Sequence, residues 1–450
     1  MQSNADAIAQ ALRQGPLSSR ALQERLSLSQ ATVSRAISEL GDAVLRIGDG
    51  RSVFYSLIDS SWIAAIPVHR VDAEGKLHEL GQLIPVRPEG FVMQRMDGTL
   101  QHSDSLPWWL ADARPQGFLG RAFAHRHAEA LGLPKSLADW SDRHALKALV
   151  ALGHDSPGNV LLGAAARTAF LTAAAPRAIA RAQRPDAFAR LAALAAEGEL
   201  PASSAGGEQP KFTAYAQTPA GARHVIVKFS PPERNAVTAR WRDLLGAEHL
   251  ALMTLREAGV LAANTELLDL GEQRFLQVER FDRIGPLGRR ALHSLGSLDD
   301  EFVGNRQAPW PAAVRQLVRA RVVAQQAEEP AALLYAYGLL IGNTDMHMGN
   351  LSFFSEPGQL CQLAPAYDML PMGFAPTPSG TLRDALPALQ LPAEVPPRVW
   401  PQALGLAQRF VAALQQLLQT GTISPDFQPC AQAIAQRLAQ AQRQVERMAV

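Results

Sequence analysis

Cysteine is scarce in this sequence, with only Cys361 and Cys430 among 450 residues. Two thiols allow at most one disulfide and cannot hold a metal cluster by themselves, so a metal centre built on cysteine alone is excluded. Such sparing use of cysteine is typical of a reducing compartment. We therefore expect a cytoplasmic protein.

Long apolar runs are also missing. A membrane-spanning helix needs about 18 or more consecutive apolar residues, and no stretch of the sequence reaches that length without charges. Residues 1–15 include Asp6 and lack the apolar core of a secretion signal. We expect neither membrane insertion nor secretion.

A charge excess of one sign is the third absence. The formal net charge is +1, which gives no overall attraction to nucleic acid or membranes, so any such contact has to come from a local patch. Apolar material is plentiful, since 47% of the residues are hydrophobic and 19% are charged. A chain of this length can form large cores, and about three domains are expected.

The first 60 residues show the order helix, helix, helix, hairpin. Apolar residues recur at helical spacing in residues 4–14, and serines that can cap a helix precede further helical stretches at 18–26 and 29–40. Two β-rich runs within residues 44–57 flank the turn Gly-Asp-Gly, which indicates a hairpin. This order predicts a winged helix-turn-helix over residues 1–60.

Such a domain offers one candidate DNA interface. The residues expected at a major groove are Ser29, Gln30, Thr32, Ser34 and Arg35, and those expected near phosphates in the wing are Arg46 and Arg51. The arginines are balanced by acidic residues, namely Glu24, Glu39, Asp42 and Asp49. Because phosphate neutralisation supplies much of the affinity for DNA, a winged helix used only for protein contacts stays open as the alternative.

The rest of the chain changes character twice. Residues 61–200 are expected to be rich in strands to about residue 120 and helical beyond it. A β-rich lobe is expected over 201–285, with strands at 211–229 and 265–281 around a long helix at 235–258, and a helical lobe over 286–450. The predicted fold class is α+β, with a small β-rich lobe followed by a large helical lobe.

Three features of the β-rich lobe could act together on a phosphate. The glycine-rich "SSAGGEQPK" at residues 203–211 can turn backbone N–H groups toward phosphate oxygens at Gly206 and Gly207, although two glycines are by themselves more often a turn. Lys228 lies in the apolar strand "HVIVKFS" and needs an anionic partner there. Glu248 falls on the apolar stripe of the long helix and is the obvious partner.

The helical lobe contains the polar loop "NTDMHMGN" between two apolar stretches. It contains Asp345 and Asn350, and Asp368 follows in "APAYDMLP". Phosphoryl transfer needs a carboxylate that orients the attacking hydroxyl, together with an amide and a second carboxylate that hold magnesium. These three residues supply those groups in that order. Met346 and Met348 are expected to pack inward and hold the shape of the loop.

Some neighbouring residues have simpler interpretations. Asp345 and His347 could belong to a metal-hydrolase site, but no second histidine cluster and no H-E-x-x-H motif accompanies them. Asp282 and Arg283 are interpreted as a surface ion pair or turn. Trp108 and Trp109 are interpreted as packing residues.

Five segments in order resemble one known family: "SAGGEQPK", "VIVKF", "VERFDR", "NTDMHMGN" and "YDML". They are similar to the HipA-like serine/threonine kinases, toxins of bacterial toxin–antitoxin modules, and in particular to the YjjJ branch with its own helix-turn-helix. The resemblance covers essentially the whole chain. It implies a bilobal protein-kinase-like fold that uses ATP and Mg²⁺ and phosphorylates itself. It also implies a protein substrate such as an aminoacyl-tRNA synthetase or another translation factor, and an antitoxin or a second copy as possible partner.

The resemblance also implies roles for individual residues. In the β-rich lobe, the loop from Gly206 to Lys211 covers the nucleotide phosphates, Lys228 braced by Glu248 contacts them, and the backbone at Glu279 and Phe281 meets the adenine. In the helical lobe, Asp345 is the catalytic base, His347 lies close to the nucleotide, and Asn350 and Asp368 bind magnesium. Ser204, or Ser203 beside it, is the position of self-phosphorylation.

One departure from the family pattern concerns the polar loop. Family members often have a lysine just before the asparagine, and Gly349 stands there in this chain. Turnover or substrate choice is therefore expected to differ. Two other functions stay open from the residues: a DNA-binding regulator whose kinase fold senses nucleotide, and a small-molecule phosphotransferase.

Overall fold

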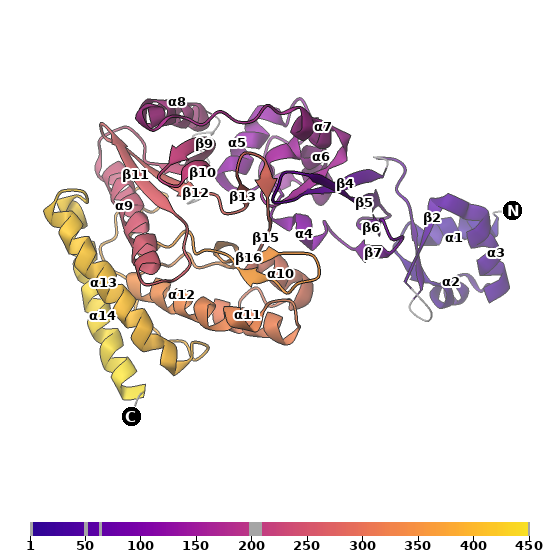
Figure 1. Cartoon of the computed structure of the whole chain (residues 1–450). Coiled ribbons are helices and arrows are strands. Elements are labelled where there is room, and N and C mark those ends of the chain that lie inside the picture. Colours follow the sequence, from indigo (N-terminus) through magenta and orange to yellow (C-terminus); the bar gives the residue numbers. More distant parts are fainter. Residues whose placement is uncertain (1–2, 49–52, 63–64, 198–208, 449–450) are drawn as a thin grey trace. The chain divides into compact units, whose positions relative to one another are not determined.

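A computed structural model describes residues 3–48, 53–62, 65–197 and 209–448 of the chain (Figure 1). The chain divides into two compact units. The first contains residues 1–72, 76–114 and 140–173, and the second contains residues 73–75, 115–139 and 174–450. Within the described ranges, no helix is both long enough and apolar enough to cross a membrane.

The first unit begins with the three helices and the hairpin that the sequence predicts. The elements are α1 (Asn4–Leu12), β1 (Leu17–Ser18), α2 (Ser19–Leu26), α3 (Gln30–Leu40), β2 (Val44–Ile47) and β3 (Phe54–Leu57). The side chains of Ser3, Ser18 and Ser29 each accept a backbone N–H in the first turn of a helix, which explains where the helices start. The three strands form a sheet in the order β1-β3-β2.

A five-stranded antiparallel sheet makes up the rest of the first unit. Its order is β7-β6-β5-β4-β8, and its strands are β4 (Ile66–Val71), β5 (Leu77–Pro85), β6 (Phe91–Arg95), β7 (Leu100–Ser103) and β8 (Val160–Leu162). The accompanying helices are α4 (Trp108–Ala111), α6 (Asp142–Leu152) and α7 (Gly163–Thr172). Trp109 packs against the core of this sheet, which confirms its structural interpretation.

The expected boundary between strands and helices near residue 120 is wrong in two respects. The strands end at Ser103 and a helix starts at Trp108, whereas β8 joins the sheet from within the stretch expected to be helical. The apolar run of β8 is too short for its period to distinguish a strand from a buried helical segment. Pairing with β4 decides the matter, and that contact is distant in sequence.

A buried carboxylate joins the hairpin to the five-stranded sheet within the first unit. Asp59 has no exposed surface, and its two oxygens bind Arg87 at 2.7 Å and Arg143 at 2.5 Å. Burial alone would raise the pKa of Asp59, but hydrogen bonds from Ser61 and the Arg143 guanidinium lower it. A charged anchor of this kind fixes the connection near residue 60.

The second unit contains a four-stranded antiparallel sheet in the order β11-β12-β10-β9. Its strands are β9 (Lys211–Thr218), β10 (Gly221–Phe229), β11 (Thr265–Leu270) and β12 (Gln273–Glu279). Phe118 of α5 (Gly117–His127) and Phe188 of α8 (Arg184–Glu197) pack against Phe212 and Phe229 on one face. Leu245 of the long helix α9 (Ala236–Glu257) packs against Leu276 on the other face.

Helices dominate the remainder of the second unit. They are α10 (Leu295–Phe302), α11 (Trp310–Arg319), α12 (Glu328–Ile341), α13 (Trp400–Gln419) and α14 (Gln428–Met448). The helices α12, α13 and α14 lie side by side (Figure 1). Two small sheets complete the unit: β13 (Arg283–Ile284) pairs with β14 (Gly288–Arg289), and β16 (Ser352–Ser355) lies between β15 (Ala291–Ser294) and β17 (Gln362–Leu363).

Candidate active site

Lys228 reaches the α9 side of the sheet because side chains alternate along a strand. Val225, Val227 and Phe229 of β10 are buried in the core shared with α5 and α8. Lys228 lies between two of them in sequence and therefore points to the opposite face. Its side chain is 6% exposed, so its ammonium group needs anionic partners within the protein.

Glu248 of α9 supplies the first of these partners. Both of its carboxylate oxygens accept hydrogen bonds from Lys228 Nζ, at 2.6 and 2.7 Å, and the residue is fully buried. Burial opposes the charge of both groups, but the nearby carboxylates outweigh it for Lys228 and raise its pKa. The predicted pairing of Lys228 with Glu248 is present in the structure.

Asp368 is the second partner, with Oδ1 at 2.5 Å from Lys228 Nζ. Burial would raise the pKa of Asp368, but the charges of Lys228 and Lys211 outweigh that effect and lower it. Its backbone has a φ of 52°, a left-handed conformation that costs energy for a residue with a side chain. In this conformation the Asp368 carboxylate contacts Lys228.

A second lysine faces the same side of the sheet. Lys211 of β9 lies directly opposite Lys228 of β10 in the strand pairing. Two like charges in such a cross-strand pair repel each other, and the carboxylates of Glu248 and Asp368 offset that repulsion. The cluster therefore holds two positive and two negative groups on one face of the sheet.

The polar loop begins where α12 ends. Gly342 adopts a φ of 86° and caps the helix, and the N–H of Asn343 closes the turn on the carbonyl of Gly338 at 2.8 Å. Asn343 is 3% exposed. Its amide oxygen accepts the N–H of Asp345 at 3.0 Å and its amide nitrogen donates to the carbonyl of Asp368 at 3.3 Å. This side chain thus joins the two segments that carry the carboxylates.

The loop is braced within itself as well. Asn350 is 8% exposed and donates from Nδ2 to the carbonyl of Asp345 at 2.7 Å. Asp345 is exposed. The loop therefore contains an exposed Asp345 whose backbone is held by the side chains of Asn343 and Asn350. Loops held rigidly in this way often carry reactive groups.

Aromatic residues hold the second half of the loop. His347 is exposed, its Nδ1 accepts the N–H of Gly349 at 3.0 Å, and its carbonyl accepts the indole N–H of Trp310 at 3.2 Å. The hydroxyl of Tyr367 donates to the carbonyl of Gly349 at 2.6 Å. His347 also lies near enough to Asp368 to help lower the pKa of that carboxyl. These contacts bring the loop and the segment around Asp368 together.

The two methionines of the loop pack inward, as predicted. Met348 is buried at 5% exposure. The sulfur of Met346 lies against Gly338 of α12, only 2.4 Å from the place a Cβ would occupy there. The absence of a side chain at Gly338 therefore makes room for the loop.

Asp282 and Arg283 form the expected ion pair and Asp282 lies in a turn, but the expected place of the pair on the surface is wrong. Asp282 is 4% and Arg283 is 7% exposed, and they form a buried ion pair at 2.6 Å. Asp282 also pairs with Arg280 at 2.9 Å. Arginines can be buried in this way because the carboxylate satisfies their donors, which the local sequence does not reveal.

The remaining predicted site residues comprise two described residues, Glu279 and Phe281, and several that the structure does not describe. Glu279 ends β12, and its N–H donates to the carbonyl of Asn264 at 2.9 Å. Phe281 contacts the ring of Tyr367 at a centroid distance of 5.7 Å, so it lies beside the segment that carries Asp368. The predicted residues Ser203, Ser204, Gly206, Gly207 and Arg51 fall outside the described residues.

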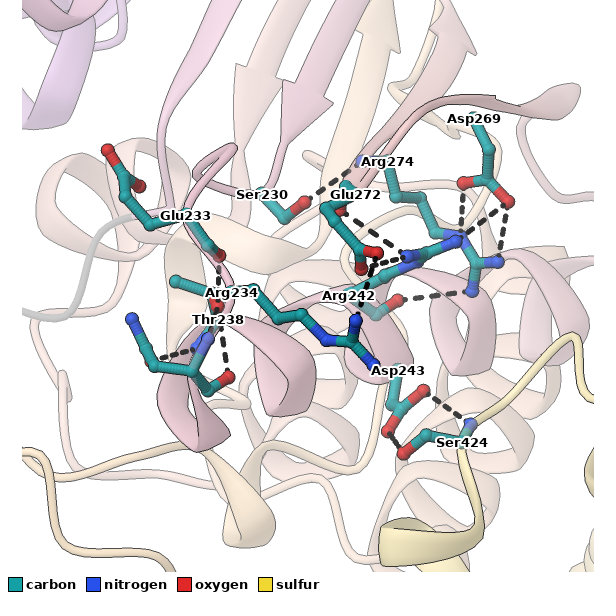
Figure 2. A network of polar contacts seen from close by, with 11 residues as sticks. Ser230, Glu233, Arg234, Thr238, Arg242, Asp243, Asp269, Glu272, Arg274 and Ser424 are labelled. Carbon is teal, nitrogen blue, oxygen red and sulfur yellow. Dashed lines mark hydrogen bonds and ion pairs between the residues drawn. The ribbon is translucent and has the colours of Figure 1, made fainter.

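A polar network fixes the start of α9, the helix that carries Glu248 (Figure 2). Arg242 binds the carboxylate of Glu272, in the turn between β11 and β12, at 3.2 Å. The carboxylate of Asp243 accepts the N–H and the hydroxyl of Ser424, at 2.8 and 2.5 Å, in the connection between α13 and α14. The helix is therefore held to the sheet on one side and to the C-terminal helices on the other.

The side-chain oxygens of Asn350 and Asp368, the predicted metal ligands, suit a hard cation. Magnesium prefers carboxylate and amide oxygens and usually keeps waters and substrate phosphates as its other ligands. Within the described ranges, no group of three or more His, Cys, Asp or Glu residues has a geometry that could hold a metal. Asn350 and Asp368 provide one amide and one carboxylate, which fits a cation bound together with a phosphate ligand.

Sequence comparison places the chain in a family. Residues 203–447 match the model of the HipA-like C-terminal domain, and residues 63–171 match that of the middle domain of YjjJ-like toxins. Toxin YjjJ of Escherichia coli (strain K12) is 40% identical over 441 residues, which cover 97% of this chain and 98% of that protein. The chain belongs to the HipA-like toxin family. Within that family it belongs to the YjjJ-like branch.

A solved structure shares the fold. HipA of Shewanella oneidensis MR-1, in a complex with HipB and operator DNA, superposes with a TM-score of 0.56 at 18% identity. The match covers 85% of this chain and 97% of that chain. The predicted α+β class with a HipA-like fold is thus confirmed.

The lysine cluster generates a test that needs no ligand. Replacing Lys228 by Met leaves the buried Glu248 carboxylate unpaired, which we expect to lower the free energy of unfolding by about 3 kcal/mol. Adding Glu248→Met removes the uncompensated charge and should restore part of the loss. Urea unfolding of both variants measures the free energy of unfolding. Lys211→Met is the control, because it removes the lysine that lies opposite Lys228 in the strand pairing. A double variant less stable than Lys228→Met would show that burial of charge is not the cause.

Proposed function

We propose that the protein is an ATP- and Mg²⁺-dependent serine/threonine protein kinase of the HipA toxin type. The observation that carries the proposal is the contact of Lys228 with both Glu248 and Asp368. A lysine fixed between a helix carboxylate and a second carboxylate is the arrangement by which kinases hold nucleotide phosphates near a metal. Membership of the HipA-like family supports the same conclusion.

Each part of the site receives a role in this proposal. Lys211, Lys228 and the backbone around Gly206 and Gly207 bind the ATP phosphates. The carbonyl of Glu279 and the N–H of Phe281 meet the adenine, since the N–H of Glu279 is already used. Asn350 and Asp368 would hold magnesium, which neutralises phosphate charge when bound. His347 lies beside the phosphates.

Asp345 is the proposed catalytic base. Its carboxylate accepts the proton of a serine or threonine hydroxyl while that oxygen forms a bond to the γ-phosphorus and the bond from phosphorus to ADP breaks. The exposed position of Asp345 on a braced loop supports this role. Glu248 acts through Lys228, which it keeps charged and oriented.

The proposed substrate is a protein, such as an aminoacyl-tRNA synthetase or another translation factor, and the family suggests an antitoxin or a second copy as a further partner. HipA of Shewanella oneidensis was solved together with HipB and operator DNA, which supports the expectation of such partners. The site itself selects no substrate. Incubation with labelled ATP, magnesium and cell extract separates a protein kinase, which labels proteins, from a small-molecule phosphotransferase, which labels metabolites.

The kinase proposal predicts different effects for the two acidic residues. Asp345→Asn and Asp368→Asn should each abolish transfer of label, because one removes the base and the other a metal ligand. Only Asp368→Asn should sharply weaken magnesium-dependent nucleotide binding. Asparagine tolerates the left-handed backbone of Asp368, so this substitution changes charge with little strain. Near-native activity in both variants would end the kinase hypothesis.

We further propose that residues 1–60 form a winged helix-turn-helix that binds operator DNA. The exposure of Gln30, Ser34 and Arg35 on α3 supports this role. Thr32 is half-buried and its hydroxyl bonds to that of Ser29 at 2.9 Å, so these two residues shape the start of the helix. Arg46 of β2 is exposed and available to a phosphate.

DNA binding by the whole chain should weaken with salt. Arg35→Ala should relax sequence preference, and Arg51→Ala should weaken binding evenly across sequences, because a groove contact reads bases and a wing contact neutralises phosphate. Fluorescence anisotropy with upstream DNA at several salt concentrations measures both effects. Arg13→Ala, an exposed arginine next to α1, serves as the control. Failure of the folded protein to bind at low salt would leave the domain as a protein-interaction module.

Self-phosphorylation of Ser204 is proposed to switch the enzyme off. A phosphate there brings about two negative charges into a loop that should receive the ATP phosphates, so repulsion should expel the loop. Ser204→Ala should keep the first turnovers and prolong activity, and Ser204→Asp should bind ATP poorly. Mass spectrometry after incubation with ATP and nucleotide titration of both variants measure this. An active preparation without phosphate on Ser203 or Ser204, together with unchanged ATP affinity in Ser204→Asp, would contradict the switch.

A further inference from the structure

A long irregular segment follows Asp368. Residues 375–396 contain no helix and no strand. Stretches of this length without regular structure are uncommon inside compact domains and are usually functional. Some backbone groups of this segment bond within its own turns, as at Thr377 and Val395, and others need partners from elsewhere, because no helix or sheet satisfies them. The question is which side chains hold this segment beside the site.

Three arginines from three different helices hold it. Arg240 of α9 donates to the carbonyl of Phe374 at 3.2 Å and to that of Arg383 at 2.9 Å, and it binds the carboxylate of Asp384 at 2.7 Å. Arg437 of α14 donates to the carbonyl of Pro387. Arg315 of α11 donates to the carbonyl of Glu394 at 3.0 Å.

Arg240 differs from the other two because its helix also carries Glu248. The two residues are eight positions apart on α9, about 12 Å along the helix axis. Glu248 reaches Asp368 through Lys228, and Arg240 reaches the chain a few residues beyond Asp368. Helix and segment are therefore tied at two points. We propose that Arg240 is a positioning residue that fixes Glu248 and Asp368 on either side of Lys228.

The environment of Arg240 fits this role. It is 3% exposed, and its guanidinium lies over the ring of Phe427 at 5.5 Å from the centroid. One planar group with several donors serves three acceptors at once, which the single ammonium of a lysine does not reproduce. Loss of these bonds would leave the buried carbonyl of Phe374 unsatisfied.

The same segment also supports the polar loop. The N–H of Gly373 donates to the carbonyl of Gly342 at 3.0 Å, directly before the loop. Leu386 packs so closely that a Cβ at Gly342 or Gly373 would lie 2.8 or 2.6 Å from it. Arg240, which binds the neighbouring Asp384, therefore positions both the lysine cluster and the start of the loop.

Other contacts of α9 do not make this connection. Asp243 holds the helix to Ser424, and Arg242 holds it to Glu272 (Figure 2). Neither contact involves the segment after Asp368. Of the contacts made by Arg240, Arg242 and Asp243, those of Arg240 join α9 to that segment. Two controls follow: the Asp243–Ser424 contact, which belongs to the same helix, and the contact of Arg437, which belongs to the same segment.

The experiment compares Arg240→Lys with Ser424→Ala and Arg437→Lys in the full chain. It measures the rate at which an acylating reagent modifies Lys228 without nucleotide, by mass spectrometry, together with Tm. In the native protein Lys228 is buried between two carboxylates and should react slowly. Arg240→Lys should speed its modification about tenfold, because lost hydrogen bonds to a charged group loosen the helix locally. The two controls should lower Tm without that increase.

Two outcomes would overturn the proposal: modification of Lys228 in Arg240→Lys at the rate of the native chain, or an equal increase in all three variants. If Arg240→Lys does not fold, Asp384→Ala removes only one acceptor, whose side chain is half-exposed, and should give a smaller increase. A second readout, weaker magnesium-dependent ATP binding, rests on the proposed kinase function. A native chain that binds no ATP but shows the Lys228 effect would refute the function and leave the positioning role intact.

Discussion

The site depends on one ammonium group held between two carboxylates. Removing three charges from water is expensive, and the mutual attraction of Lys228, Glu248 and Asp368 offsets that cost only while all three are in place. Each member comes from a different element: a strand, a helix and an irregular segment. The cluster therefore adds little stability of its own but requires these three elements to take one relative position. The cluster therefore fixes the relative positions of these three elements within the second unit.

The apolar cores hold the strand and the helix in the positions that the cluster requires. Phenylalanines and valines fill the face of the sheet toward α5 and α8, whereas Leu245, Leu276 and Val278 pack on the face toward α9. Alternation along β10 sends Lys228 to the α9 face, where Glu248 interrupts the apolar stripe of the helix. A shift of one residue in the register of β10 would turn the Lys228 side chain into the aromatic core. The packing of the cores and the lysine cluster therefore require the same strand pairing.

Local sequence pattern was sufficient for the parts of the site that lie on regular elements. A lysine in an apolar strand and an acid on the apolar stripe of a helix predicted Lys228 and Glu248 as partners, and the structure contains that pair. The roles predicted for Asp345 and Asn350 in the polar loop stay predictions. Asn343 and Arg240 were missed as site residues because their partners lie far away in sequence. The burial of Asp282 and Arg283 was missed for a different reason: their ion-pair partners are neighbours in sequence, and a local charge pattern does not reveal whether such a pair is buried. A polar residue directly after a buried helix, as at Asn343, is the one local signal that could have been used.

The charge balance of the site bears on the proposed binding of a polyanion. Lys211 and Lys228 are matched by Glu248 and Asp368, so the described cluster is close to neutral. Asp368 shares the lysine with Glu248, and its strained backbone shows that the surrounding structure holds it there. A ligand that brings a cation for Asp368 and phosphates for the lysines would replace this internal pairing by a stronger one. If the lysine exchanges partners with such a ligand, both carboxylates have to keep their places, which is what the proposed tie between α9 and the segment after Asp368 would provide.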